Sequence, residues 1–307
     1  MSGNRGGAMR SRERGVAFIL VLWVIAMLSI LLGSFALIAR TENLQSRHLF
    51  DTTQARYAAE AGLNLAVYEL RKADPLERWV ADGRPYRFGY GDAEIEIAIT
   101  DDSGKIDINA AGGNGDLLTN LFVTHGVALD QAQALSDAVQ DWIDSDDNTR
   151  PNGAEIAQYK AAGLPYGPKN APFDTVSELQ QVLGMTYDLY QKIEPAITIY
   201  SGRNAPSAAF ANEDALRAMY PDASPEQIQQ LVQSIQSQPP GSPPGGIMAP
   251  DGTPVVAGGG GLTYSVKSRA KLQNGASTVL DATIRMGGVG AAGRPFVILR
   301  WRDGETS

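Results

Sequence analysis

The chain has 307 residues and contains no cysteine and only two histidines. Without cysteine it can form neither a disulfide framework nor a thiolate metal site, and it has no cysteine nucleophile. His48 and His125 lie far apart in the sequence with no local partner, so we expect each to be a surface or packing residue. No serine stands in a nucleophile elbow. We therefore predict that the protein is not an enzyme.

Charged side chains are absent from residues 16–39. This run exceeds the roughly 20 apolar residues that a helix needs to cross a bilayer. Arg10, Arg12 and Arg14 stand directly before it, and a basic flank of this kind stays on the cytoplasmic side. The pattern predicts a single membrane-spanning helix, with the rest of the chain exported.

The small residue next to the apolar run stands before it, which is unusual for a signal peptide. A secretory signal peptide has a shorter apolar core, followed by a small-residue cleavage site. Here the run is longer, and Gly15 precedes it. This order resembles the leader of type IV pilin-like proteins, which implies cleavage between Gly15 and Val16 by a prepilin peptidase, with methylation of the new amino terminus. From the amino terminus alone, a plain signal anchor is the alternative.

Acidic residues outnumber basic ones, 34 against 26, so the formal net charge is −8. Residues 1–15 hold four arginines and one glutamate, and their removal changes the side-chain charge from −8 to −11. An acidic protein repels the phosphates of nucleic acids and anionic lipids. We predict no nucleic-acid partner.

Proline is absent from residues 40–72, and apolar residues there recur at three- and four-residue spacing. The positions are Leu44, Ala55, Ala58, Ala59, Leu63, Val67 and Leu70. Asp74-Pro75 ends the pattern. We predict one helix from Val16 to about Lys72, about 85 Å long at 1.5 Å per residue, whose second half packs on a globular domain.

Strand patterns flank a long helical region. Residues 93–100 alternate polar and apolar side chains, and residues 105–109 resume the alternation after a turn. Asn274-Gly275 predicts a hairpin between strands 262–272 and 277–286, with a third strand at 295–302. Between these parts, helices are predicted at 117–125, 129–144, 154–162, 175–183, 186–193, 213–220 and 225–236.

These patterns predict an α+β fold in which a pilin-like amino-terminal helix packs on an antiparallel sheet and a large all-helical domain is inserted into the sheet. The predicted parts are a leader (1–15), a spine helix (16–72), a sheet (73–111 and 262–307), an inserted helical domain (112–236) and a mobile Gly/Pro-rich loop (237–261).

Several motifs resemble one family more closely, the minor pseudopilin K of type II secretion systems. The mature chain would open at Val16, and its fifth residue is Leu20, where pilin-like proteins usually have a glutamate. The opening 14–24, Arg40-Thr41-Glu42, the segment 58–62 and the stretch 102–111 also resemble this family. The inserted helical domain is the architecture that the resemblance implies.

The resemblance implies a mechanical role at the tip of the periplasmic pseudopilus. There the protein would associate with minor pseudopilins I and J and help to start assembly for export across the outer membrane. Leu20 would mark a subunit that needs no neighbour above it. Two alternatives remain open: a minor type IV pilin of an adhesion or DNA-uptake filament, and a membrane-tethered periplasmic metal-dependent hydrolase.

The densest group of carboxylates runs from residue 141 to 155. Such carboxylates repel one another, and calcium takes roughly six to eight oxygen ligands from clusters of this kind. EF-hand spacing, with residue 144 at position one, predicts the ligands Asp144, Asp146, Asn148, Arg150 (through its carbonyl oxygen) and Glu155, with Asp141 and Asp147 as further candidates. Thr149 replaces the usual glycine at position six, so only the ligand spacing resembles an EF-hand. The resemblance to pseudopilin K also implies calcium, and a solvated acidic loop is the alternative.

Residues 179–193 resemble a helix-hairpin-helix motif, which binds nucleic-acid phosphates through glycine-rich hairpin amides. Only Gly184 is present here, and the local charge is negative. We therefore interpret this segment as a helical packing module.

Overall fold

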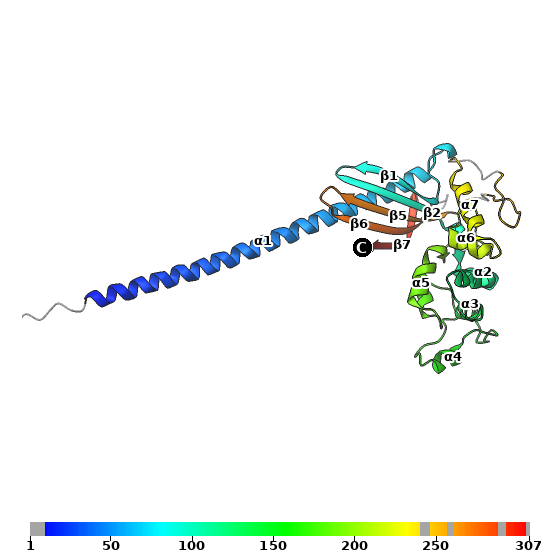
Figure 1. The fold of residues 1–307 in the computed structure, drawn as a ribbon, viewed down its shortest axis with the longest axis horizontal. Coiled ribbons are helices and arrows are strands. Elements are labelled where there is room, and N and C mark those ends of the chain that lie inside the picture. Colours follow the sequence, from blue (N-terminus) through cyan, green and yellow to red (C-terminus); the bar gives the residue numbers. More distant parts are fainter. Residues whose placement is uncertain (1–9, 240–245, 257–260, 288–292, 305–307) are drawn as a thin grey trace, which may run out of the picture. The chain divides into compact units, whose positions relative to one another are not determined.

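The computed structural model describes residues 10–239, 246–256, 261–287 and 293–304, and for residues 10–15 and 111–114 it describes the backbone alone. The chain divides into two compact units, Met1–Gln54 and Ala55–Ser307. Helix α1 (Arg10–Leu70) contributes to both units (Figure 1). The long amino-terminal helix predicted from the sequence is thus confirmed, although it begins at Arg10 instead of Val16.

In the Met1–Gln54 unit, the apolar part of α1 has no covering within the structure. Its most apolar window of 18 residues has a mean hydropathy of 2.8, and none of it is buried. Trp23 and Leu31, for example, are 63% and 71% exposed. A single apolar helix of this length fits a single-pass membrane anchor. Leu44, which we predicted to pack on the globular domain, is 60% exposed, so that prediction is wrong.

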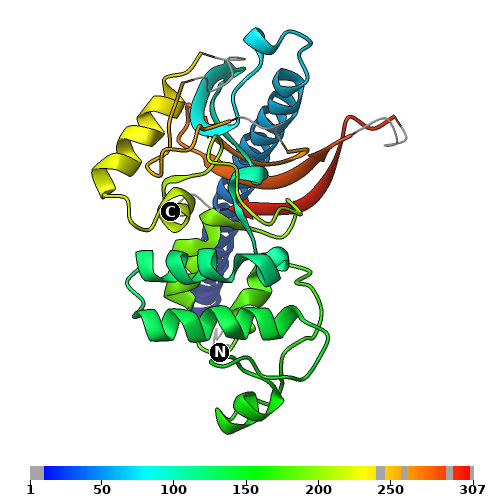
Figure 2. The ribbon, with the colours of Figure 1, turned by 90° about the vertical axis from the view of Figure 1, so that its right-hand side faces the viewer.

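The second unit contains a five-stranded antiparallel sheet in the order β1-β2-β5-β6-β7 (Figure 2). The strands are β1 (Asp82–Tyr90), β2 (Ala93–Asp101), β5 (Thr263–Leu272), β6 (Ser277–Met286) and β7 (Phe296–Gly304). β2 and β5 pair directly from Ala93↔Leu272 to Asp101↔Tyr264, although a long segment separates them in sequence. The three carboxy-terminal strands and the strand at residues 93–100 were predicted.

One face of this sheet packs on the last four turns of α1. Ala55, Ala59, Leu63 and Ala66 of the helix are almost fully buried in this cluster. They meet the alternating apolar side chains of the strands, namely Ile95, Ile97, Ile99, Val266, Ala270, Leu280, Ala282 and Ile284. The small residues on α1 let the helix axis approach the sheet closely.

The structure differs from the predicted strands in two places. Residues 105–109 form only the two-residue strand β3 (Ile106–Asp107), which pairs in parallel with β4 (Ile197–Thr198) outside the main sheet. A short 3-10 turn at Ile108–Ala110 ends it because the chain turns into helix α2 there. β1 was not predicted, since glycines and a proline interrupt its alternation.

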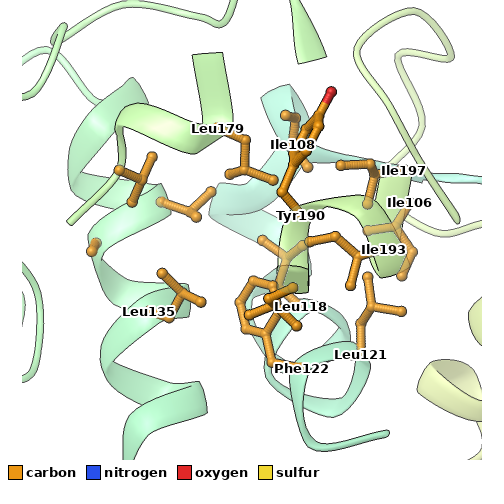
Figure 3. Packing of buried hydrophobic residues seen from close by; sticks show 14 of the residues in the cluster. Ile106, Ile108, Leu118, Leu121, Phe122, Leu135, Leu179, Tyr190, Ile193 and Ile197 are labelled. Carbon is orange, nitrogen blue, oxygen red and sulfur yellow. The ribbon is translucent and has the colours of Figure 1, made fainter. Parts of the chain in front are cut away.

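The helical block lies between β3 and β5 in sequence. Its helices are α2 (Ala111–Thr124), α3 (Leu129–Ile143), α4 (Ile156–Ala161), α5 (Tyr187–Ile193), α6 (Glu213–Met219) and α7 (Pro225–Gln236). The helix expected at 175–183 is a 3-10 helix, Val176–Gln181. Figure 3 shows the core of this block, to which three helices contribute buried side chains: Leu118 and Phe122 of α2, Leu135 of α3, and Tyr190 and Ile193 of α5.

The predicted mobile loop at residues 237–261 is in part packed. Within its described residues, Ile247, Ala249 and Val255 are buried beside Leu216 of α6 and Leu231 of α7. Backbone hydrogen bonds from Val255 N to Ile247 O (2.9 Å) and from Ala249 N to Thr253 O (2.8 Å) hold this segment. The prediction is wrong for residues 246–256, and residues 240–245 and 257–260 lie outside the described chain.

A buried polar network joins the sheet to the helical block. The Asp102 carboxylate, 1% exposed, accepts hydrogen bonds from Thr198 of β4 (2.8 Å) and Ser265 of β5 (2.6 Å), and it pairs with Lys105 Nζ at 2.8 Å. Because a buried charge is costly when it loses a partner, this network fixes the point where the chain leaves the sheet for the block.

Candidate metal site

At the amino-terminal junction the structure describes only part of the predicted features. Gly15 and Val16 both lie within the continuous helix α1. Leu20 is 60% exposed, and its apolar neighbours are exposed to a similar extent. The aliphatic side chain at this position has the same environment as the rest of the apolar segment, which is the surface that a lipid bilayer would cover.

The predicted calcium loop begins where α3 ends. Ala138 and Trp142 of α3 are buried in the core of the block, and Asp141 lies on the same side of the helix and is fully buried. Asp144 is the residue that follows the last helical residue, and its side chain is 24% exposed. The burial of these apolar neighbours therefore places two carboxylates at the inner edge of the loop.

The side chain of Arg150 stands against both of these carboxylates. Its Nε lies 3.3 Å from Asp141 Oδ1 and its Nη2 lies 3.3 Å from Asp144 Oδ2. The Arg150 backbone N–H also points at the Asp141 carboxylate, at 3.3 Å and 3.4 Å from its two oxygens. A monovalent side-chain cation thus occupies part of the space that the sequence assigned to a divalent ion.

Glu155 carries the clearest electrostatic signal in the loop. It is 3% exposed, and burial, followed by the charge of Asp141 and then of Asp144, raises its pKa from 4.5 to about 7. Burial also raises the pKa of Asp141, and burial followed by the charge of Asp146 raises that of Asp144. All three shifts have burial as their largest cause, and the charges of neighbouring carboxylates add to it, so ionising the whole group in this place is costly.

Four oxygens in and beside this loop are buried without a hydrogen-bond partner. They are Oδ1 of Asp144, Oε1 and Oε2 of Glu155, and Oδ1 of Asn170. Asn170 has a positive φ of 50° and donates from Nδ2 to the carbonyl of Asp146 (3.3 Å) and to Asp147 Oδ1 (3.0 Å). Unpaired buried oxygens are costly, and a hard cation is the ligand that satisfies such a set.

The other predicted ligands lie farther out. Asp146, Asp147 and Asn148 are exposed, and Asp146 Oδ1 accepts the backbone N–H of Asn148 at 2.9 Å. The Arg150 carbonyl, expected to bind the ion, accepts from Gly153 N at 3.0 Å. Within the described chain, no group of three or more acidic or histidine side chains is already arranged to hold a metal ion. Asp141, Asp144 and Glu155 are the least exposed carboxylates of the loop, and Asn170 is a neighbouring residue that the sequence did not indicate.

The remaining features that we singled out have structural partners. Lys169 Nζ pairs with Asp174 (2.7 Å) and Glu178 (3.0 Å) beside the segment that resembles a helix-hairpin-helix. His125, which has no local partner in the sequence, has its Nε2 3.6 Å from Oδ1 of the distant Asp214. The histidine lies at the end of α2 and the aspartate in α6, so this contact joins two helices of the block.

Comparison with known proteins shows that this chain is similar to members of one family. Residues 99–202 match the family model described as type II secretion system protein K. The type II secretion system protein K of Klebsiella pneumoniae is 30% identical over 209 residues, covering 62% of this chain and 63% of that protein. The protein K of Pseudomonas aeruginosa is 26% identical over 245 residues, covering 73% of each. These matches confirm the resemblance found in the sequence motifs, although the chain spans less than two thirds of the Klebsiella relative.

The fold has a counterpart among solved structures. A chain of the crystal structure of the GspK-GspI-GspJ complex from enterotoxigenic Escherichia coli matches with a TM-score of 0.56 at 20% identity. The match covers 87% of this chain and 99% of that one. The predicted α+β fold, with its long amino-terminal helix, antiparallel sheet and further helices, is confirmed.

Proposed function

We propose that this chain, which resembles protein K of type II secretion systems, is a minor pseudopilin that sits at the tip of the pseudopilus and helps to start its assembly. The observation that carries the proposal is the joining of two features in one chain. A charge-free apolar helix follows Gly15, and the globular unit behind it contains the matched residues 99–202.

The amino-terminal segment gives the proposed protein its place in the cell. The basic residues before Gly15 stay in the cytoplasm, and residues 16–39 span the inner membrane. Prepilin peptidase cuts between Gly15 and Val16, and the new amino terminus is methylated. The apolar surface of α1 remains in lipid until neighbouring subunits offer an equivalent apolar bundle.

Two features of the chain support the tip position. A carboxylate in the bilayer costs about 2.5–3.5 kcal/mol on insertion scales, so it is retained only where a partner charge requires it. Leu20 needs no such partner. The helical block between β3 and β5 adds bulk that a repeating filament interior does not accommodate, and the end of a filament imposes no such limit.

Pseudopilins I and J are the proposed partners. The support is the matched structure, which is a complex of three proteins named GspK, GspI and GspJ. In this proposal the protein acts mechanically and catalyses no reaction.

We further propose that the loop from Asp141 to Glu155 holds a structural calcium ion. Asp141, Asp144 and Glu155 would be its inner ligands, with Asn170 Oδ1 and the exposed Asp146, Asp147 and Asn148 within reach of a rearranged loop. The unpaired buried oxygens of Asp144, Glu155 and Asn170 support this assignment. The ion would supply the positive charge that the Arg150 guanidinium now supplies in part, and would fix the loop against α3.

The test of the proposed function has two measurements on the full chain. Mass spectrometry of protein taken from the membrane should give a chain that begins with methylated Val16. Co-purification in detergent should recover pseudopilins I and J with it. A chain that retains Met1, or is cut beyond Ala39, contradicts the pseudopilin assignment. A correctly processed chain that copurifies with type IV pilins instead would favour the minor-pilin alternative, and hydrolytic activity lost with Glu155 would favour the tethered hydrolase.

A further inference from the structure

The outer face of the sheet, opposite α1, carries a row of cations on a central strand. Val266, Ser268 and Ala270 of β5 are buried against α1. The residues between and after them, Lys267, Arg269 and Lys271, alternate with this buried set, so they lie on the opposite face, where all three are exposed. Their positions along the strand are about 7 Å apart.

Lysines are common on edge strands, where they prevent unwanted strand pairing. That explanation does not apply to β5, which lies between β2 and β6 in the middle of the sheet. Each of the three cations has an acid opposite it on a neighbouring strand, Asp281 for Lys267, Glu96 for Arg269 and Glu94 for Lys271, and opposite charges in this arrangement stabilise a sheet. The charge that this face presents to a partner therefore depends on how far these acids are already paired.

The acids on this face neutralise only part of the positive charge. Glu96 of β2 forms ion pairs with two arginines, with Arg87 Nε 2.7 Å and Arg269 Nη1 3.3 Å from its oxygens. Asp281 of β6, only 22% exposed, pairs with Arg300 and Arg302 of β7, and Glu194 of the helical block pairs with the same two arginines at 3.0 Å and 3.2 Å. Among the described residues, Lys267 and Lys271 form no ion pair, although Lys267 stands opposite Asp281 and Lys271 opposite Glu94 in register.

The exposed part of this surface, which we call the basic sheet face, consists of Arg87, Lys267, Arg269, Lys271 and Arg302. Arg87 is 68% and Arg302 53% exposed; of the acids, Glu94 is also exposed, whereas Glu96 and Asp281 are 30% and 22% exposed. These five cations and Arg300 outnumber Glu94, Glu96, Asp281 and Glu194, so the formal charge of this face is positive. The whole chain has a net charge of −8, so this face is opposite in sign to the protein that carries it.

We propose that the basic sheet face is a docking surface for the acidic surface of a neighbouring pseudopilin subunit. This inference rests on the proposed function, because it assumes that the chain assembles with pseudopilins I and J. Arg87 and Arg269 each form one ion pair with Glu96, and a planar guanidinium retains further donors that match carboxylates in pairs. A folded acidic surface can offer several carboxylates in one fixed arrangement, which a fluid surface of lipid headgroups does not.

The experiment compares two charge-reversed variants of the full chain in detergent. The test variant carries Lys267→Glu, Arg269→Glu and Lys271→Glu. The control carries Lys160→Glu, Lys192→Glu and Arg203→Glu, which reverse three exposed cations of the helical block and give the same net charge. The affinity for purified pseudopilins I and J is measured at low and high salt, and a thermal melt establishes that each variant is folded.

We expect the test variant to bind about tenfold more weakly at low salt, as the loss of several exposed ion pairs would give, and to lose most of the salt dependence. The control should bind within about twofold of the original chain. A milder variant with Gln at the same three positions should fall between the two, which keeps the test valid if the Glu variant does not fold.

Equal binding by the test variant and the original chain overturns the docking surface, and so does an equal loss in the control. Retention of the subunits together with loss of binding to phosphatidylglycerol vesicles would identify a lipid surface and would also overturn it. If the original chain itself binds neither pseudopilin I nor J, the proposed function fails first, and this outcome is distinct from the others.

Discussion

The side chain of Asn109 pairs with the backbone of Phe173 through two hydrogen bonds. Asn109 Nδ2 donates to the Phe173 carbonyl at 3.0 Å, and Phe173 N donates to Asn109 Oδ1 at 2.7 Å. Asn109 lies in the 3-10 turn before α2, and Phe173 packs in the core against Trp142, with ring centroids 5.9 Å apart. An amide is the side chain that offers a donor and an acceptor side by side.

We predict that Asn109→Asp destabilises the folded chain by about 1–3 kcal/mol, because a carboxylate would face the Phe173 carbonyl without a proton to donate. The measurement is the free energy of unfolding by denaturant. Asn204→Asp, at an exposed position, introduces the same charge and should leave stability within error. A similar loss in both variants would mean that added charge, and not the lost donor, is responsible.

Gly62 in α1 packs directly against Ser268 of β5 and Ile95 of β2. A Cβ at this position would lie 2.2 Å from Ser268 Oγ, 3.0 Å from Ile95 Cγ2 and 3.3 Å from Ser268 Cβ. Helix propensity alone favours alanine here by about 1 kcal/mol, whereas overpacking of a core costs about 1–3 kcal/mol. We therefore expect Gly62→Ala to lower stability overall.

Ser268 offers a way to test this cause. Its Oγ is buried without a hydrogen-bond partner, so Ser268→Ala alone should be close to neutral. The double variant Gly62→Ala, Ser268→Ala lacks the closest contact. We expect it to recover part of the stability that Gly62→Ala alone loses. A double-mutant cycle that gives a coupling near zero would show that Gly62 is not required for the contact with β5.

Much of this fold was predictable because its elements carry local patterns. The helices α3 and α7, the strand β2 and the hairpin at Asn274-Gly275 each follow from periodicity or turn chemistry. β1 escaped prediction because Gly83, Pro85 and Gly89 interrupt its alternation, and only the partner strand β2 supplies its register.

The candidate site was predictable in part. Periodicity on α3 places Asp141 on the same side as Ala138 and Trp142, so the sequence could have ranked Asp141 as an inward carboxylate. Asn170 gave no such signal, since only the tertiary fold brings it to Asp146 and Asp147. Residues 246–256 were misjudged for the same reason: glycine and proline mark loops, but the buried side chains of Ile247 and Val255 depend on α6 and α7.

Gly104 occupies a position that no larger residue can share. A Cβ there would lie 2.2 Å from the carbonyl carbon of Phe210 and 2.6 Å from Ala211 N, and these backbone atoms cannot rotate away. We predict that Gly104→Ala costs about 3 kcal/mol, at the upper end of the usual overpacking range. Gly89→Ala is the matched control, since nothing lies within 4 Å of its Cβ position. Equal melting temperatures for the two variants would contradict this account of the junction.

Glu155 makes the stability of the metal-free protein depend on pH. Its pKa rises from 4.5 in the unfolded chain to about 7 in the folded one, so the folded state binds the proton more tightly. With respect to this side chain, the folded state has its full stability below about pH 4.5 and loses stability progressively as the pH rises through about 7. We therefore expect chelator-treated protein to melt at a lower temperature at about pH 8 than at about pH 5.

Calcium should reverse this loss, because it binds the ionised carboxylate and so stabilises the folded state most at the higher pH. Glu155→Gln removes the charge and should abolish both the pH dependence in chelator and most of the gain from calcium. Asp188→Asn neutralises an exposed carboxylate outside the loop and should preserve both responses. If calcium leaves the melting temperature of the original chain unchanged at about pH 8, the loop is a solvated acidic segment and Arg150 alone supplies its counter-charge.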